Sequence, residues 1–397
     1  MEECAVEIQN IEAVPLAWQL PESSKKWWSD YGPRNEINAV IVKVETDEGL
    51  VGYGEVHTGY GYTRGACWSA KAIVEKELAP EIIGEDPTLP EYVWEKMYNG
   101  PRTELALTYG HSCPRLSRRG VTICAMSGID MALWDIFAKS LGVPIYKLLG
   151  GGYRTKIPAY ASGGHAPPEH AGAQAMSYIK RGFRAMKMRV GGMDAPRVVE
   201  GSITRIKAVR EAIGPDVALM LDAHGSLNVS QAIRLAQAAE PYDITWFEEP
   251  VSSDDWDGMA RVRNSTTIPI STGENDFTQF DFRDIILKGA ADILQPDLAI
   301  VGGFTAARRV AMFAKAANLQ CAPHVWGSAI LFAASLHLAA AIPNCPIFEF
   351  RMGECGLFTD LLAEPFSIDL DGFVTVPNKP GLGVEFDLEE AKQKFPF

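Results

Sequence analysis

The sequence has few positive charges and no closely spaced cysteine pairs. These two features argue against certain binding partners and against a disulfide-stabilised fold. Its 397 residues carry 37 Lys and Arg against 50 Asp and Glu, a formal net charge of −13. We therefore expect neither nucleic acid nor an anionic membrane as a partner. The seven cysteines are scattered, and no two of them form a C-x-x-C pair. This pattern predicts reduced thiols and not a disulfide framework.

We expect neither a targeting segment nor a membrane span in this sequence. The first ten residues, MEECAVEIQN, are acidic and lack the apolar core of a signal peptide. The most apolar run, SAILFAASLHLAAAI, carries Ser335 and His337 and falls short of a membrane span. No low-complexity tract or charged tail is present, and the isolated G-x-G patterns do not open a βαβ unit. We expect a cytoplasmic enzyme without a nucleotide site.

A regular alternation of strands and helices begins near residue 155. Eight short runs rich in β-branched and aromatic residues predict buried strands, and helical patterns separate most of them. The runs span residues 156–162, 183–190, 217–224, 243–250, 268–275, 292–298, 319–325 and 346–350. Eight such units in about 200 residues are typical of a (β/α)₈-type barrel.

The two ends of the chain do not follow this alternation. Residues 6–18 and 38–56 predict strands, with a hairpin turn at 46–49, and residues 123–142 predict a helix. Strand and turn patterns return at 366–387. We expect an N-terminal α+β capping domain at 1–130, a barrel at 131–355, and a segment at 356–397 that returns to the capping domain.

Three acidic residues end three successive runs of the predicted barrel. Asp222, Glu248 and Glu274 close the runs VALMLDAH, DITWFEEP and IPISTGEN at equal intervals of 26 residues. Because parallel strands end at the same edge of a sheet, the three carboxylates should converge, and unpaired they would repel one another. Carboxylate oxygens are ligands of hard divalent cations, so the sequence predicts a Mg²⁺ site.

Other polar side chains end the neighbouring runs at the same edge. They are Lys187, Arg189, His224, Asp297, His324 and Glu349. Strand side chains alternate, so Lys187 should share a face with Arg189, and Asp222 with His224. In barrels of this kind the chemistry lies at the carboxyl ends of the strands. The sequence therefore places two cations and two histidines around the predicted metal.

The order of these motifs resembles the enolase superfamily, and within it the mandelate racemase-like branch. The matching stretches are MKMR, MLDAH, WFEEP, TGEN, QPDLAIVGG, APH, FEF, PGLGVEFD and the helix ALWDIFAKSLGVPIYKLLGG. The resemblance implies an α/β fold, a modified TIM barrel of the (β/α)₇β-like kind, with an α+β capping domain formed from the N- and C-terminal segments. It also implies a homo-oligomer.

The same resemblance assigns roles to individual residues. Asp222, Glu248 and Glu274 would bind Mg²⁺, with Glu249 in a supporting or structural place. Asp297 and His324 would form a dyad in which the carboxylate orients the imidazole as a base; the alternative is a hydrogen-bonded core histidine.

Glu349 would donate a hydrogen bond to a developing enolate, and its alternative is an ion pair with Arg351. QPDLAIVGG also lacks the lysine of the muconate cycloisomerase and dipeptide epimerase branch, which disfavours that branch.

Two departures from the racemase pattern favour dehydration. Arg189 replaces a lysine that serves as a base in racemases, and an arginine is better suited to binding a carboxylate. His224 forms an Asp-x-His motif, which related sugar-acid dehydratases use as an acid on the leaving hydroxyl; a neutral hydrogen-bond donor is its alternative. We therefore expect an aldonate or aldarate to be converted to a 2-keto-3-deoxy acid, with His324 as the base.

Several alternatives stay open from the sequence. Lys187 could be the base with His324 as the acid, and a racemase or epimerase of a 2-hydroxy acid could oppose Lys187 or Arg189 to His324. A non-catalytic protein that binds a carboxylate is a third possibility, although such a binder has no use for a buried Asp–His pair.

Substrate specificity should come from loops of the first domain that cover the barrel mouth. The candidates are Trp27, Trp28, Tyr31, Arg34, His57, Tyr60 and Tyr62. The alternative for each of them is surface packing.

Overall fold

The computed structural model describes residues 6–21, 35–57, 63–114 and 120–397. Trp27, Trp28, Tyr31, Arg34, Tyr60 and Tyr62 lie outside the described residues. The predictions made for these six side chains therefore stay predictions.

The N-terminal part opens with an antiparallel sheet in the order β1-β2-β3. Its strands are β1 (Ile8–Gln19), β2 (Glu36–Thr46) and β3 (Val51–Val56). The predicted hairpin turn joins β2 to β3, where the Thr46 hydroxyl accepts a hydrogen bond from the backbone N–H of Leu50 at 3.0 Å. Gly49 occupies the left-handed region at φ 80°, which a glycine adopts without strain.

Helices follow this sheet along the chain. They are α1 (Arg64–Ala72), the π-helical η1 (Ile73–Leu78), α2 (Ala79–Ile82), α3 (Pro90–Asn99), the 3₁₀ turn η2 (Gly100–Arg102), α4 (Thr103–Tyr109), α5 (Val121–Ser140) and α6 (Ile145–Leu148). By length and composition α5 could cross a membrane, but 89% of its apolar stretch is buried inside the protein. One such helix is weak evidence for a membrane span, and its burial is that of a core helix.

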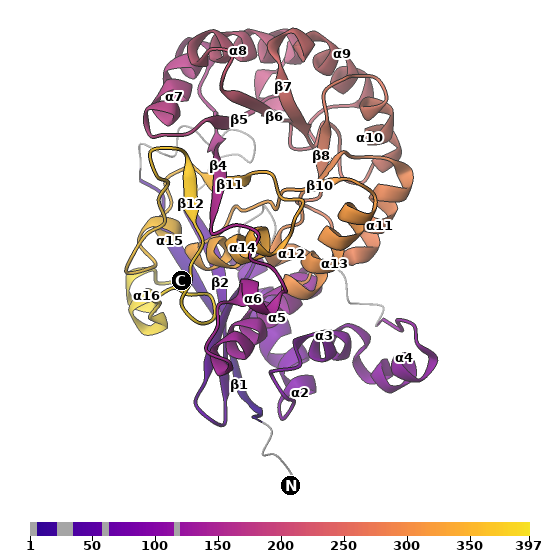
Figure 1. Cartoon of the computed structure of the whole chain (residues 1–397), viewed down its shortest axis with the longest axis vertical. Helices are drawn as coiled ribbons and strands as arrows, with labels where there is room; N and C mark the ends of the chain where they lie inside the picture. Colours follow the sequence, from indigo (N-terminus) through magenta and orange to yellow (C-terminus); the bar gives the residue numbers. More distant parts are fainter. Residues whose placement is uncertain (1–5, 22–34, 58–62, 115–119) are drawn as a thin grey trace.

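The predicted barrel is confirmed strand by strand (Figure 1). Each of the eight predicted runs overlaps one strand: β4 (Lys156–Gly163), β5 (Ala185–Arg189), β6 (Ala218–Asp222), β7 (Ile244–Glu248), β8 (Ile270–Thr272), β9 (Ile293–Leu294), β10 (Gln320–Cys321) and β11 (Phe348–Arg351). Neighbouring strands pair in parallel, from β10 back through β9 to β4 and then to β11.

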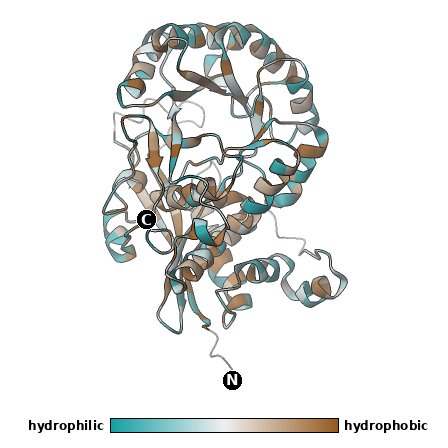
Figure 2. Ribbon diagram, in the orientation of Figure 1, coloured by the Kyte–Doolittle hydropathy of each residue, from teal (hydrophilic) through white to brown (hydrophobic). Residues whose placement is uncertain are grey.

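Helices connect these strands and cover the outside of the sheet (Figure 1). They are α7 (Pro168–Lys180), the turn η3 (Gly192–Asp194), α8 (Val198–Ile213), α9 (Val229–Ala239), the turn η4 (Glu240–Tyr242), α10 (Trp256–Arg263), α11 (Thr278–Lys288), α12 (Leu298–Val301), α13 (Gly303–Ala316) and α14 (Ala329–Ala341). In Figure 2 hydrophobic and hydrophilic residues recur in turn along the outer helices, as expected for helices with one buried face. After β11 the described chain continues with the short α15 (Gly356–Thr359) and the C-terminal segment and adds no further parallel strand to the barrel, so the (β/α)₇β prediction is confirmed.

The C-terminal segment contacts both parts of the molecule. Its strand β12 (Phe373–Thr375) pairs antiparallel with β4 of the barrel, a contact that the sequence did not predict. Further along, the N–H of Leu382 donates to Asp135 on α5 at 2.8 Å. In the last helix, α16 (Leu388–Lys394), Lys392 pairs with Glu12 of β1 at 3.3 Å. The proposed domain boundaries at 130 and 355 stay predictions.

Close packing of α5 on β3 joins the sheet to the helical layer. A Cβ atom added at Gly54 would lie 2.0 Å from the carbonyl oxygen of Gly128, because the two backbones touch there. One residue further, the buried Glu55 accepts hydrogen bonds from the backbone and hydroxyl of Ser328, at the start of α14. β3 is thereby fixed against the barrel just beyond His324.

We predict that Gly54→Ala destabilises the protein by about 3 kcal/mol, because the added methyl group forces the two backbones apart. Chemical unfolding measures the change. The control is Gly65→Ala in α1, whose added Cβ meets only the Thr63 hydroxyl at 3.9 Å. It should change stability by less than about 1 kcal/mol. Equal stability of the two variants would contradict the close packing.

Candidate active site and metal centre

The predicted metal ligands and cations lie on adjacent strands. The register pairs Arg189 with Asp222, Asp222 with Glu248, and Glu248 with Ser271. Glu274 follows two residues after the end of β8. The carboxylates of Asp222, Glu248 and Glu274 are all buried, so their charges face a medium that solvates them poorly.

Lys187 lies among these carboxylates. Its Nζ atom forms an ion pair with the carboxylate of Glu248. The same atom lies 3.0 Å from Oε1 of Glu349 and 3.7 Å from Oδ2 of Asp222. Burial lowers the pKa of Lys187, but Glu248 and Glu349 outweigh burial and hold this pKa well above its usual value. Nη1 of Arg189 lies 2.9 Å from Oδ1 of Asp222. Lys187 and Arg189 therefore partly neutralise the negative charge of the predicted metal ligands Asp222 and Glu248.

Two further side chains hold Glu248 in place. The indole N–H of Trp246 donates to its Oε2 atom at 3.1 Å, and the amide of Gln295 donates to the same atom at 2.6 Å. Burial raises the pKa of Glu248 to about 8, against the opposite effect of Lys187. The sequence analysis did not select Trp246 or Gln295, although each is two residues from a selected carboxylate.

Asp297 and His324 form the predicted pair. Oδ2 of Asp297 lies 2.7 Å from Nδ1 of His324, while its Oδ1 accepts from the N–H of Ala299 at the start of α12. Nε2 of His324 is directed to the site, 3.6 Å from Glu274 and 4.0 Å from Glu349. Burial lowers the pKa of His324, but Glu274, Glu349 and Asp297 outweigh it and raise this pKa to about 10.

Glu349 occupies the side of the site next to His324. Its Oε2 atom accepts from the N–H of Val325 at 2.7 Å. Burial raises its pKa, but Lys187 and His324 outweigh burial and lower it. The alternative ion pair with Arg351 is wrong: within the described residues Glu349 pairs with Lys187, and Arg351 forms no ion pair with a described carboxylate.

His224 reaches the site by a different route from the one predicted. β6 ends at Asp222, and His224 has a left-handed backbone with φ 49°. Strand alternation therefore does not set its direction. Its N–H donates to Oδ1 of Asp222 at 2.9 Å, and its Nε2 atom lies 3.1 Å from Oε1 of Glu274.

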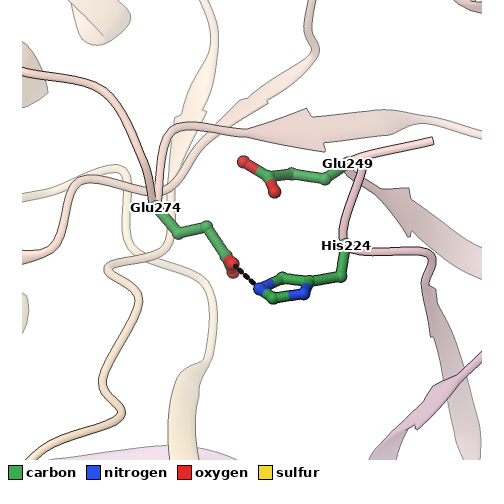
Figure 3. Close-up of side chains that lie close together, drawn as sticks. All are labelled: His224, Glu249 and Glu274. Carbon is green, nitrogen blue, oxygen red and sulfur yellow. Dashed lines mark ion pairs between the residues drawn. The ribbon is translucent and has the colours of Figure 1, made fainter. Parts of the chain in front are cut away.

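A compact group of possible metal ligands contains one residue that the sequence did not favour. Ligand atoms of His224, Glu249 and Glu274 all lie within 4.8 Å of one another (Figure 3). Glu249 has a left-handed backbone with φ 36°, and both its oxygens accept from Asn275. Burial, followed by the charge of Glu274, holds the pKa of Glu249 well above its usual value.

Glu274 is the residue common to this compact group and the predicted set of ligands. Its Oε1 atom makes no well-aligned hydrogen bond with a described residue, despite its short distance to His224. Burial raises the pKa of Glu274, but His324 and His224 outweigh it and hold this pKa well below its usual value. Asp222 and Glu248 pair instead with Arg189 and Lys187, so their role as ligands stays a prediction.

Two further histidines lie close to these groups. His57 is buried, and its N–H donates to the carbonyl of Ala299 at 3.3 Å. Burial lowers the pKa of His57 to about 4, although Asp297 opposes this effect. His165, in the loop after β4, was missed by the sequence analysis. Burial, together with Arg189, lowers the pKa of His165 to about 3.

Comparison with known proteins assigns the family. Residues 29–150 match the N-terminal domain of mandelate racemase and muconate lactonizing enzyme, and residues 170–391 match the enolase C-terminal domain-like family. The chain belongs to the enolase superfamily, in its mandelate racemase-like branch. This confirms the resemblance seen in the motifs at the strand ends.

Individual members of the superfamily match over most of their length. The chain is 36% identical to D-galactarolactone cycloisomerase of Agrobacterium fabrum, with 88% of this chain and 89% of the relative aligned. It is 35% identical to D-galactonate dehydratase of Pectobacterium atrosepticum, over 88% and 89% of the two chains. A crystal structure of an enolase superfamily member from Polaromonas sp. JS666 superposes with a TM-score of 0.86 at 34% identity, covering 98% of each chain.

These relatives confirm the prediction of an enzyme and support the hydro-lyase class. Within the superfamily fold, the capping domain and the barrel correspond to the two matched families. The free state of the described cysteines, which are Cys67, Cys113, Cys124, Cys321, Cys345 and Cys355, agrees with the expectation of reduced thiols.

We predict that Asp297→Asn lowers the pKa of His324 from its value of about 10, because the amide removes one of the charges that stabilise the imidazolium. NMR titration of the histidine ring resonances of the metal-free protein measures this change. His337, buried against the carbonyl of Leu382, should keep its pKa of about 4 and serves as the internal control. A His324 pKa unchanged by Asp297→Asn would contradict the pairing.

Proposed function

We propose that the protein is a Mg²⁺-dependent dehydratase that converts a sugar acid, an aldonate or an aldarate, to a 2-keto-3-deoxy acid. The main observation behind the proposal is that two histidine side chains approach the carboxylate of Glu274. Nε2 of His324 and Nε2 of His224 approach its two oxygens, at 3.6 and 3.1 Å. Dehydration needs one base and one acid near the same substrate carbons, and two imidazoles can serve both roles.

The buried charges of the site fit a divalent cation. Carboxyl groups outnumber the cations Lys187 and Arg189 among the described residues around the strand ends. The buried carboxyl groups are Asp222, Glu248, Glu249, Glu274, Asp297 and Glu349. Oxygen donors suit Mg²⁺, and we assign Asp222, Glu248 and Glu274 as its ligands. When bound, the ion would stabilise negative charge on the substrate carboxylate.

His324 is assigned as the base that removes the proton α to the carboxylate. Asp297 holds Nδ1, which leaves Nε2 to accept the proton. Because Glu274 and Glu349 raise the pKa of His324, neutralising their charge would lower this pKa toward the range of a base at neutral pH. The ammonium of Lys187 lies where it can stabilise the charge that develops on the substrate oxygens. Glu349 would donate a hydrogen bond to these oxygens only in its protonated form.

His224 is assigned as the acid on the leaving group. The C2 proton passes to His324, the electron pair of the C2–H bond forms the C2–C3 double bond, and the C3–O bond breaks. His224 gives a proton to the departing hydroxyl, which leaves as water. The resulting enol tautomerises to the 2-keto-3-deoxy acid. Arg189, which stays protonated, would bind the substrate and not act as a base.

A cycloisomerase is the second candidate, because the Agrobacterium relative carries that name and is 36% identical. The same proton abstraction would then expel a ring oxygen, so the product would have the mass of the substrate and no water would be released.

A racemase would need a second base. Lys187 is paired with carboxylates that hold its pKa well above its usual value, which disfavours that alternative. The relatives named as enzymes disfavour a non-catalytic carboxylate binder.

A homo-oligomer and a cytoplasmic location are proposed only from the resemblance to the superfamily and from the composition. The substrate is a small acid, and the acidic surface gives no reason to expect a nucleic-acid partner.

A screen of aldonates and aldarates with Mg²⁺, read by semicarbazide trapping of 2-keto products, tests the proposed activity. His324→Asn should lower kcat by about 10³-fold, since the general base is lost. His170→Asn, an exposed histidine on α7, is the matched control and should retain full activity. Formation of 2-keto acid at the wild-type rate by His324→Asn would contradict the assignment of the base.

Metal binding tests the ligand assignment. Mg²⁺ at 100 times its Kd should stabilise the protein by about 2.7 kcal/mol, and chelation should reverse this. Glu274→Gln and Glu248→Gln should each weaken Mg²⁺ binding by at least about 100-fold in calorimetry, because each removes a charged ligand.

Glu249→Gln is the matched neighbour in this experiment and should weaken Mg²⁺ binding by less than about 10-fold. The opposite order, with Glu249→Gln disruptive and Glu248→Gln neutral, would move the ion to the compact group of His224, Glu249 and Glu274.

A further inference from the structure

Within the described part of the chain, Arg351 is a buried cation without an anionic partner. The residue is 3% exposed at the end of β11, and its Nε and Nη2 atoms have no hydrogen-bond partner among the described residues. Nη1 reaches only the carbonyl of Gly327, at 3.5 Å. None of the described carboxylates forms an ion pair with this guanidinium. Buried charges in proteins are normally paired, so the arrangement is that of a site prepared for an anion.

The position of Arg351 relates it to the proposed chemistry. It lies two residues beyond Glu349 on β11, so the two side chains leave the same face of the strand. Because β11 runs toward the barrel mouth, Arg351 lies one step further out than Glu349. Arg351 is also one of the charges that act on the buried His57 of the capping domain, whose pKa it lowers.

Packing fixes the orientation of the guanidinium. Its Cζ atom lies 4.7 Å from the ring centre of Trp326, which follows His324 by two residues. A cation held over an aromatic ring keeps its plane while its edge stays available for hydrogen bonds. The two unpartnered atoms, Nε and Nη2, form one edge of the guanidinium, the fork that binds both oxygens of a carboxylate.

We propose that Arg351 binds the distal carboxylate of the substrate, so that the physiological substrate is a dicarboxylate, an aldarate and not an aldonate. The proposal rests on the proposed function, because the first carboxylate is the one next to the proton removed by His324. Two residues of strand separate Glu349 from Arg351 by about 7 Å. Five carbon–carbon bonds of about 1.5 Å each span roughly 6 Å when extended. A six-carbon diacid therefore reaches from one group to the other.

Matched substrates test this inference directly. Galactarate and D-galactonate share their configuration and differ at C6, which is a carboxylate in one and an alcohol in the other. The wild-type enzyme should prefer the diacid in this pair, or in another pair of the same kind if a different configuration is turned over. Arg351→Gln should lower kcat/KM for the diacid by about 100-fold, mainly through KM, and change that for the monoacid by less than about 3-fold.

The control variant is Arg181→Gln, an exposed arginine over the ring of Phe183 at 6.0 Å. This substitution also removes a cation above an aromatic ring, and it should leave kcat/KM unchanged for both the diacid and the monoacid. Arg351→Lys should retain part of the preference, because the charge remains while the fork is lost. Equal losses for both substrates in Arg351→Gln, with a lower melting temperature, would show a purely structural arginine and overturn the inference.

A binding experiment separates this inference from the proposed activity. Adipate and hexanoate are unreactive six-carbon acids with two carboxylates and one. Arg351→Gln should weaken the binding of adipate by at least about 10-fold in calorimetry and leave hexanoate unchanged. If no acid is turned over but this difference appears, the proposed activity fails and the anion site stands. If acids are dehydrated but the diacid has no advantage, the inference fails and the activity stands.

Discussion

Buried negative charge at the carboxyl ends of β6, β7 and β8 is the constraint on which the rest of the site depends. Asp222, Glu248 and Glu274 cannot share a poorly solvated space without positive charge nearby. Lys187 and Arg189 supply part of that charge from the adjacent β5, and the histidines contribute to it when protonated. The site is therefore a network of mutually dependent charges. A bound metal would neutralise the negative charge of the carboxylates that protons and the cationic side chains neutralise in its absence.

The frame around this network is built from close contacts. β3 packs on α5 through glycine, and Glu55 fixes the first turn of α14 immediately after the segment that carries His324. Asp297 serves two roles, because one oxygen starts α12 and the other orients His324. Because Asp297 is held at the start of α12 while it orients His324, the fold itself sets the orientation of the proposed base.

Much of the fold could be predicted from the sequence, and the reasons are physical. All eight barrel strands were predicted, because buried parallel strands leave short continuous apolar runs. Residues on the strands themselves, such as Lys187 and Glu349, were placed correctly for the same reason. The pairing of β12 with β4 depends on a long-range contact that no local pattern records.

The part of the site that lies beyond the strand ends was harder to predict. His224 and Glu249 adopt left-handed backbones, so period-2 alternation cannot give the direction of their side chains. Similarly, the ion pair of Glu349 with Arg351 was plausible from their spacing, but Lys187 on another strand takes that place. Arg351 is thereby left with an edge that no described residue binds, which only the three-dimensional structure reveals.

The most direct test of the central claim is a proton NMR time course in D₂O, with Mg²⁺ and an acid that the wild-type enzyme turns over. The account predicts a 2-keto-3-deoxy acid with one deuterium at C3, while the remaining substrate keeps its C2 proton and its configuration. Recovery of substrate with deuterium at C2 in both configurations, and without any keto acid, would contradict a dehydratase and establish two opposed bases.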